Sequence, residues 1–254
     1  MSTESDLSAL HTRLQAEGFA FLGAKTMEGL LGVPQLLGDW QAFIESWNEL
    51  APDPYLAAKG RRRRRRYSTF DIAADGSITR NPPQPHVQTV QNNTLQGGIE
   101  RWFVPIRPKI SDGPSFRRIL QFTHGLFGGL APGVARWHVE THQFRIEASA
   151  DKAGEPTPEG VHRDGVDYVL VLMITRTNIE SGITTIHRGN GGLLGSFTLT
   201  RPLDAALVDD ARVSHGVTAV KPFDPTKPAY RDVLVVTFKA AAYCGTASDC
   251  AYEQ

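Results

Sequence analysis

The chain has 254 residues, of which 41% are hydrophobic, and its basic and acidic residues balance to a formal net charge of zero. A chain of this length can bury a sizeable core, and one domain over residues 1–254 is the simplest expectation. The neutral balance gives no support for nucleic acid as a partner, and no apolar stretch reaches the length of a membrane span. A polar start and two closely spaced cysteines, Cys244 and Cys250, predict a cytoplasmic protein with reduced thiols.

Helical spacing of apolar residues dominates the first half of the chain. It predicts helices over residues 5–18, 36–50 and 115–127, with Pro52 stopping the second of them. A short strand is expected between the first two, over residues 19–22. These elements are expected to form a helical support.

Strand-like runs recur at short intervals after residue 136, separated by glycine, asparagine and proline. Such spacing favours a sandwich or a barrel. We therefore predict a mainly β protein with N-terminal helices (α+β), folded as a double-stranded β-helix, the cupin-like jelly roll. Residues 1–130 would supply the helices and first strands, and residues 131–245 the jelly-roll core. The expected strands are 137–146, 167–175, 182–187, 193–199, 205–209, 213–220 and 232–240.

The most informative motif is His-Arg-Asp at residues 162–164. On a strand, His162 and Asp164 point the same way, because side chains alternate between faces. His215, between two later apolar runs, can supply a third ligand. Two histidines and one carboxylate with open positions beside them form the ligand set of non-haem Fe(II) oxygenases. A lone His-x-Asp triplet also fits an ordinary surface or core histidine, and it is the combination that favours a metal site.

Arg231 opens another apolar run, residues 233–238. A guanidinium at the mouth of a buried strand grips a carboxylate through two hydrogen bonds and keeps its charge at any working pH. Near a metal-binding histidine, such a group suits a dicarboxylate cosubstrate.

Together these features resemble the Fe(II)/2-oxoglutarate-dependent dioxygenases, and in particular the bacterial group of amino-acid hydroxylases that includes L-isoleucine dioxygenase. The resemblance extends from about residue 60 to residue 240. Its matching segments are residues 65–70, 86–88, 91–93, 97–103, 137–145, 156–165, 214–218 and 230–232.

The resemblance implies that His162, Asp164 and His215 bind Fe(II), and that Arg231 binds the distal carboxylate of 2-oxoglutarate. The superfamily often has Ser or Thr two residues after this arginine, where this chain has Val233. Tyr230 is therefore a second candidate for that carboxylate. The implied reaction consumes O2 and 2-oxoglutarate and hydroxylates a free or N-substituted aliphatic L-amino acid.

Four further residues are candidates for substrate binding: Arg66, Gln91, Gln143 and Arg145. Each also has an ordinary structural interpretation, as a loop hydrogen-bond partner or a strand ion pair. Arg66 ends a run of six arginines, residues 61–66. If the run is part of a strand, alternate arginines face opposite sides, one solvated and one toward the active site.

Two alternatives remain open. One is a cupin-like metal enzyme that does not use 2-oxoglutarate, for which Arg231 is the discriminating residue. The other is a non-catalytic β-barrel binding module that contacts nucleic acid through the arginine run. A homodimer is compatible with either enzyme.

Overall fold

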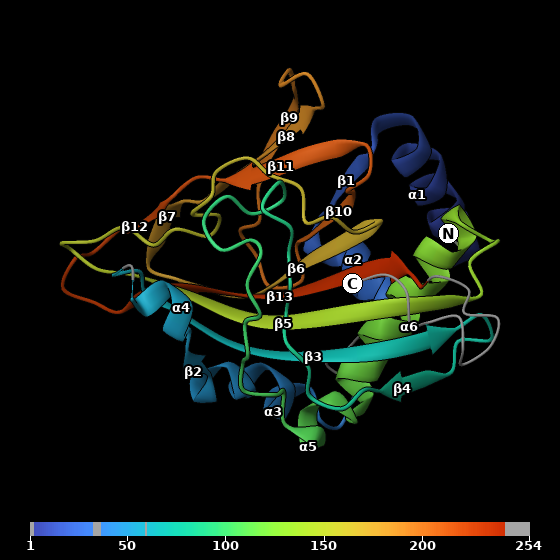
Figure 1. The fold of residues 1–254 in the computed structure, drawn as a ribbon, viewed down its shortest axis with the longest axis horizontal. Coiled ribbons are helices and arrows are strands. Elements are labelled where there is room, and N and C mark those ends of the chain that lie inside the picture. The colour runs from blue at the N-terminus through green and yellow to red at the C-terminus, as the bar shows by residue number, and fades with distance from the viewer. Residues whose placement is uncertain (1–2, 33–36, 59, 242–254) are drawn as a thin grey trace.

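The computed structural model describes residues 3–32, 37–58 and 60–241. Its largest element is an antiparallel sheet of eight strands, with the order β1-β10-β6-β13-β5-β3-β2 and β4 paired to β3 (Figure 1). The strands are β1 (Phe19–Leu22), β2 (Ala51–Pro52), β3 (Arg63–Ala73), β4 (Ile78–Arg80), β5 (Arg136–Ala148), β6 (Tyr168–Thr177), β10 (Ala205–Asp209) and β13 (Ala229–Ala240). Strands from both halves of the chain thus share one sheet.

The smaller sheet has the order β11-β8-β9, and β12 pairs with β7 nearby. In Figure 1 these strands lie above the long strands of the large sheet. Their bounds are β7 (Ile179–Ser181), β8 (Ile183–Arg188), β9 (Leu193–Thr198), β11 (Val213–Val217) and β12 (Val220–Pro222). A large and a small antiparallel sheet make up the predicted jelly roll, so the fold-class prediction is confirmed.

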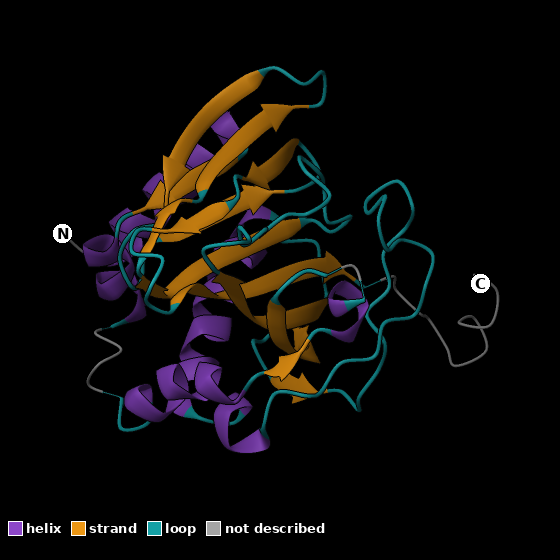
Figure 2. Ribbon diagram, turned by 90° about the vertical axis from the view of Figure 1, so that its left-hand side faces the viewer, coloured by secondary structure: helices purple, strands orange, loops and turns teal. Residues whose placement is uncertain are grey.

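Most of the helices gather along one side of the large sheet (Figure 2), whereas the short helix α4 lies apart from them (Figure 1). None of the described helices is long and apolar enough to cross a membrane. They are α1 (Thr3–Glu17), α2 (Ala24–Leu31), α3 (Trp40–Glu45), the 3-10 helix η2 (Ser46–Glu49), α4 (Pro54–Ala57), α5 (Pro108–Ser111) and α6 (Pro114–Leu130).

Alternation along the three central strands decides which side chains meet the helices. Phe70 of β3, Val139 of β5 and Val236 of β13 are fully buried in the core that the helices share. Their sequence neighbours point the other way, because the side-chain period of a strand is two. That second face lines a cavity, and it carries charged and histidine side chains, among them Arg65, Glu140, His142 and Arg231.

Several sequence-based expectations differ from the structure in detail. The helix expected over residues 36–50 begins at Trp40 and tightens into a 3-10 turn at Ser46, and Leu36 lies outside the described residues. Helix α2 was not predicted. The strand expected over residues 213–220 is divided into β11 and β12. Cys244 and Cys250 lie outside the described residues as well.

Candidate metal and substrate site

The cavity lies between the large sheet and the segments that lead into the small sheet. It has a volume of about 190 Å³. Its walls are the second face of β3, β5 and β13, the loop residues between 86 and 101, the segment from 156 to 166, and parts of β6 and β11. His162, Asp164, His215 and Arg231 all line it, so the structure brings the four main predicted residues to one place.

A backbone pairing places the three candidate metal ligands. His162 and His215 exchange two backbone hydrogen bonds of 2.9 Å in an isolated antiparallel bridge. His162 precedes β6 in an irregular segment and is not on a strand, which corrects the strand expected for residues 162–164. The imidazole rings still lie 4.6 Å apart between centroids. One ligand atom from each of His162, Asp164 and His215 lies within 4.8 Å of the other two.

The donor set fits a divalent metal. His162 Nε2 lies 3.5 Å from Asp164 Oδ1, and His215 Nε2 lies 3.6 Å from Asp164 Oδ2. His162 Nδ1 lies 3.1 Å from the carbonyl of Gly160. Because a carbonyl only accepts, Nδ1 carries the proton, and in the neutral ring the Nε2 lone pair is free to bind an ion. A histidine fixed in this way through its other nitrogen is typical of metal sites.

The electrostatics of the three groups are strongly coupled. Burial opposes ionisation of Asp164, but the neighbouring imidazoles of His162 and His215 hold the pKa of this carboxyl well below its usual range. Burial would lower the pKa of His162, yet Asp164 raises it to about 9. Burial lowers the pKa of His215 to about 4. An ionised carboxylate between two imidazoles is an arrangement that a metal cation would stabilise.

Asp210 supports the metal segment and was not predicted. Its buried carboxylate accepts hydrogen bonds from the backbone N–H groups of Asp164, Gly165 and Val166 at 2.8–3.2 Å. Oδ1 also lies 3.8 Å from His215 Nδ1. Asp167, three residues after Asp164, accepts from the backbone N–H of Ala240 instead.

Arg231 is a buried cation in an apolar wall. Its side chain is 2% exposed, and Nε and Nη1 have no hydrogen-bond partner within the described residues. Burial and the nearby charge of Arg176 lower its pKa to about 10, which leaves it charged at neutral pH. A buried charge without a partner is costly, and a carboxylate entering the cavity would remove that cost.

Tyr230 lies on the opposite face of β13 from Arg231. Its ring packs under the guanidinium of Arg145 at 4.1 Å, away from the cavity. The sequence-based assignment of Tyr230 to 2-oxoglutarate therefore does not agree with its position.

The four residues predicted to bind substrate do not line the cavity either. Arg66 donates to the carbonyls of Pro105 and Glu49. Gln143 donates to Ser46 Oγ on the helix-covered side. Arg145 forms a two-point ion pair with Asp232, and Gln91 is exposed. Strand alternation explains the first three, because Arg66, Gln143 and Arg145 share the face that meets the helices.

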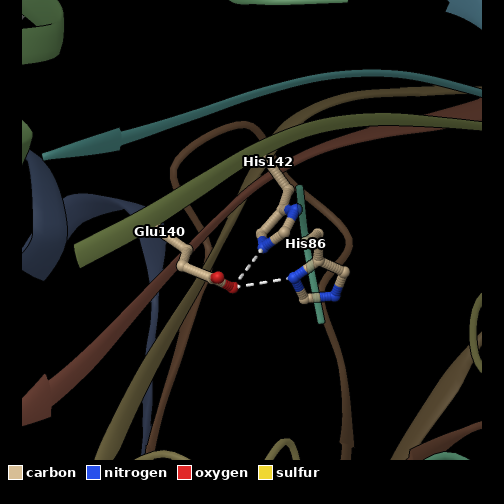
Figure 3. Close-up of side chains that lie close together, drawn as sticks. All are labelled: His86, Glu140 and His142. Carbon is tan, nitrogen blue, oxygen red and sulfur yellow. Dashed lines mark hydrogen bonds and ion pairs between the residues drawn. The ribbon is translucent and has the colours of Figure 1, made fainter. Parts of the chain in front are cut away.

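The opposite face of the same strands supplies the polar lining. Arg65 of β3 and Glu140 and His142 of β5 line the cavity, beside His86 and Arg101 from the preceding loop. The carboxylate of Glu140 points toward the imidazoles of both His86 and His142, whose rings lie 4.9 Å apart between centroids (Figure 3). A signal for this face was present in the sequence, because the apolar residues Phe70, Ile72, Trp137 and Val139 mark the face that packs on helices.

Gln88 links this polar lining to the metal ligands. Its Oε1 accepts from Arg101 Nη2 at 2.7 Å, and its Nε2 donates to Asp164 Oδ1 at 3.4 Å. A molecule bound to Arg101 would therefore be connected to Asp164 through the side chain of Gln88.

The arginine run is mostly paired inside the protein. Arg63 makes two hydrogen bonds to buried Asp53, and Arg64 pairs with Glu147. Arg61 pairs with Glu155. The guanidinium of Arg65 stacks on the ring of Phe103 at 3.6 Å. These contacts give the run a structural role and, through Arg65, a place in the cavity wall.

Comparisons with known proteins agree on a family. Residues 44–237 match the family model described as 2OG-Fe dioxygenase. A curated relative, 3(1)-hydroxy-L-isoleucine 4-dioxygenase of Pantoea ananatis (strain AJ13355), is 24% identical, with 90% of this chain and 94% of that protein covered.

Solved structures share the fold. A bsmA homologue from Methylobium petroleophilum PM1 has a TM-score of 0.84 and 36% identity, with 95% of this chain and 94% of that chain covered. The Fe(II)/α-ketoglutarate-dependent dioxygenase TqaL has a TM-score of 0.76 and 21% identity, with 96% and 90% covered.

Proposed function

Because the chain belongs to the 2OG-Fe dioxygenase family, whose members use Fe(II), 2-oxoglutarate and O2, we propose that it hydroxylates a free or N-substituted aliphatic L-amino acid. His162, Asp164 and His215 would hold the iron, since they offer two imidazole nitrogens and a carboxylate around one point. The observation that carries the proposal is Arg231. It is a buried, incompletely paired cation that lines the same cavity as these three ligands.

When bound, the iron and 2-oxoglutarate supply the oxidising chemistry, in which the keto acid is converted to succinate and CO2 and one oxygen atom enters a C–H bond. The chain's own groups position the reactants. Arg231 would hold the distal carboxylate of 2-oxoglutarate through charge-assisted hydrogen bonds. Asp210 holds the backbone that presents Asp164, and the carbonyl of Gly160 fixes the ring of His162.

The cavity has both surfaces that an aliphatic amino acid needs. Val171, Val233 and Val235 provide an apolar wall. Arg65 and Arg101 provide positive charge, and each keeps a buried Nε without a hydrogen-bond partner among the described residues. The α-carboxylate of the substrate would pair with these guanidinium groups. The name of the Pantoea relative, which acts on a hydroxylated isoleucine, supports the same substrate class.

The remaining parts of the proposal concern the protein as a whole. Residues 1–254 would act as one dioxygenase domain on small molecules in the cytoplasm, and as a monomer or a homodimer. Size-exclusion chromatography with light scattering would decide between the two.

A succinate-release screen tests the proposed function. Purified protein, Fe(II), ascorbate and 2-oxoglutarate would be incubated with the proteinogenic L-amino acids and their N-acyl derivatives. We expect an aliphatic member of one set to stimulate succinate release and to gain 16 mass units. If no member of either set stimulates succinate release, the proposal is contradicted.

A further inference from the structure

Glu140 is a carboxylate that faces the cavity from β5 and that the metal site does not use. Oε2 lies 2.9 Å from His86 Nδ1 and 3.6 Å from His142 Nε2, and Oε1 accepts a hydrogen bond of 2.7 Å from the hydroxyl of Tyr67 (Figure 3). The Glu140 side chain is 16% exposed. Glu140 therefore contacts His86, His142 and Tyr67 through its carboxylate, while part of its side chain stays accessible from the cavity.

The protonation of these neighbours follows from Arg65. Its Nη2 lies 2.6 Å from His142 Nδ1. A guanidinium only donates, so Nδ1 of His142 is the acceptor and the ring proton of neutral His142 is on Nε2, toward Glu140. Burial lowers the pKa of His142 to about 3, which keeps this ring neutral. Tyr67 and both imidazoles thus present N–H or O–H donors to Glu140.

These donors keep Glu140 ionised. Burial alone would raise the pKa of Glu140, but interactions with His86 and His142 hold it well below the usual range. Within the described residues, no lysine or arginine forms an ion pair with Glu140. Arg65 is directed to His142, and Arg101 donates to Gln88 and Gln96. The carboxylate is a negative charge supported by neutral donors, with room for a cationic donor on the cavity side.

We propose that Glu140 binds the ammonium group of the substrate, so that the enzyme acts on free α-amino acids and not on N-acylated ones. This inference rests on the proposed function. It decides whether the substrate is a free or an N-substituted amino acid, which the proposed function leaves open. Glu140 would take the ammonium, while Arg65 and Arg101 would take the carboxylate. An N-acyl amide carries no positive charge, and its acyl group would bring an uncharged carbonyl toward the Glu140 carboxylate.

A second metal ion is the other cation that this cluster could hold, because His86, Glu140 and His142 each offer a ligand atom. Three features favour the ammonium. Nδ1 of His142 already accepts from Arg65, and the guanidinium groups of Arg65 and Arg101 would both repel a divalent ion more strongly than a monovalent one. The carboxylate oxygen Oε1 is also occupied by Tyr67.

The test uses Glu140→Gln, which keeps the shape of the side chain and removes its charge. Glu147→Gln is the matched control, because Glu147 is on the same strand but pairs with Arg64 outside the cavity. Anaerobic calorimetry with the Fe(II) and 2-oxoglutarate complex would measure affinity for L-isoleucine and N-acetyl-L-isoleucine. The succinate-release screen, extended over both sets of compounds, would be run in parallel.

For the wild type, we expect succinate release with free amino acids and at least tenfold weaker response to their N-acetyl derivatives. Glu140→Gln should weaken binding of the free amino acid about 10- to 150-fold, the loss of one charge-assisted contact. The Glu140→Gln variant should keep the wild-type affinity for 2-oxoglutarate and still bind one Fe(II) per chain. The control variant, Glu147→Gln, should behave as the wild type in every measurement.

A response to N-acetyl derivatives equal to or above that to free amino acids would overturn the inference and leave the proposed hydroxylase function standing. Two metal ions per chain in the wild type and one in Glu140→Gln would overturn it in favour of a second metal site. If the wild type did not bind 2-oxoglutarate, the proposed function itself would be contradicted.

Discussion

His162 and His215 are joined by two backbone hydrogen bonds of 2.9 Å, one in each direction. This bridge connects the segment before β6 to the middle of β11. Thr157 joins the same two parts of the chain, because its hydroxyl donates to the carbonyl of Val217 and accepts from the backbone N–H of Val217. The bridge holds the two imidazole rings 4.6 Å apart between centroids. The polypeptide itself therefore preorganises the candidate ligands, and the groups that hold this bridge should control metal affinity.

Asp210→Asn should lower the affinity for Fe(II). The carboxylate accepts three backbone N–H groups around Asp164, and an amide cannot replace all of these acceptors. Loss of such a supporting group typically reduces metal affinity by about 10- to 100-fold. Anaerobic Fe(II) titration would measure the change. Asp209→Asn is the control, and an equal loss in that variant would show that Asp210 has no specific role.

Arg231→Ala should weaken binding of 2-oxoglutarate. Removing one partner of a buried charged contact costs about 2–5 kcal/mol, which corresponds to roughly 30- to 4,000-fold in the dissociation constant. Binding of 2-oxobutyrate, which has no distal carboxylate, should change little. An unchanged requirement for 2-oxoglutarate in this variant would favour a cupin-like enzyme that does not use it.

The stability of the protein should fall as the pH drops from about 6.5 to about 3, in part because of His142. Burial lowers the pKa of His142 in the folded protein to about 3, from the usual 6.5 of a solvent-exposed histidine. Between these values the unfolded chain binds a proton that the folded protein excludes, so the free energy of unfolding decreases by up to about 1.4 kcal/mol for each unit of pH. Above pH 6.5 this contribution is fully present.

Urea unfolding at pH 7 and pH 5 would test this contribution in the wild type and in His142→Gln. The wild type should lose more of its free energy of unfolding between these two pH values than the variant does. Equal losses would mean that His142 does not exclude a proton in the folded state.

Asp53→Asn should destabilise the fold strongly. Asp53 is fully buried, accepts from the backbone N–H groups of Tyr55 and Leu56 at the start of α4, and pairs with Arg63. Without its charge, Arg63 and Arg65 are left buried without an anion, at a cost of about 3–5 kcal/mol.

The matched control for this prediction is Asp71→Asn. Asp71 is one-third exposed and lies 3.8 Å from Arg136, and pairs of this kind contribute about 0–1 kcal/mol. Urea unfolding would compare the two variants. Similar small losses would show that Asp53 is not needed to hold the arginines of β3.

Much of the fold follows from local patterns. The strands at 19–22 and 205–209 agree with the structure to the residue, because each is a short buried run between turn residues. The convergence of His162, Asp164 and His215 was also expected, because these residue types carry a known chemistry. What the pattern left open was the orientation of β3 and β5. A single strand shows two faces, and which one meets the helices depends on partners elsewhere in the chain.

That ambiguity explains why the predicted substrate-binding residues do not line the cavity. Arg66 and Gln143 were assigned to the cavity, although they face the helices, whereas Arg65 and His142 face the cavity. The apolar residues farther along the same strands carry the missing information, because they mark the helix-covered face. Asp210 could not be found in this way, since its role consists of contacts to a backbone segment more than forty residues away.

The central claim is that His162, Asp164 and His215 hold one ferrous ion with 2-oxoglutarate beside it. Anaerobic addition of Fe(II) and 2-oxoglutarate, followed by visible absorption spectroscopy, tests this most directly. The account predicts a weak charge-transfer band at one iron per chain in the wild type, abolished by a chelator and absent in Asp164→Ala. No band in a folded wild-type protein, or an undiminished band in Asp164→Ala, would contradict it.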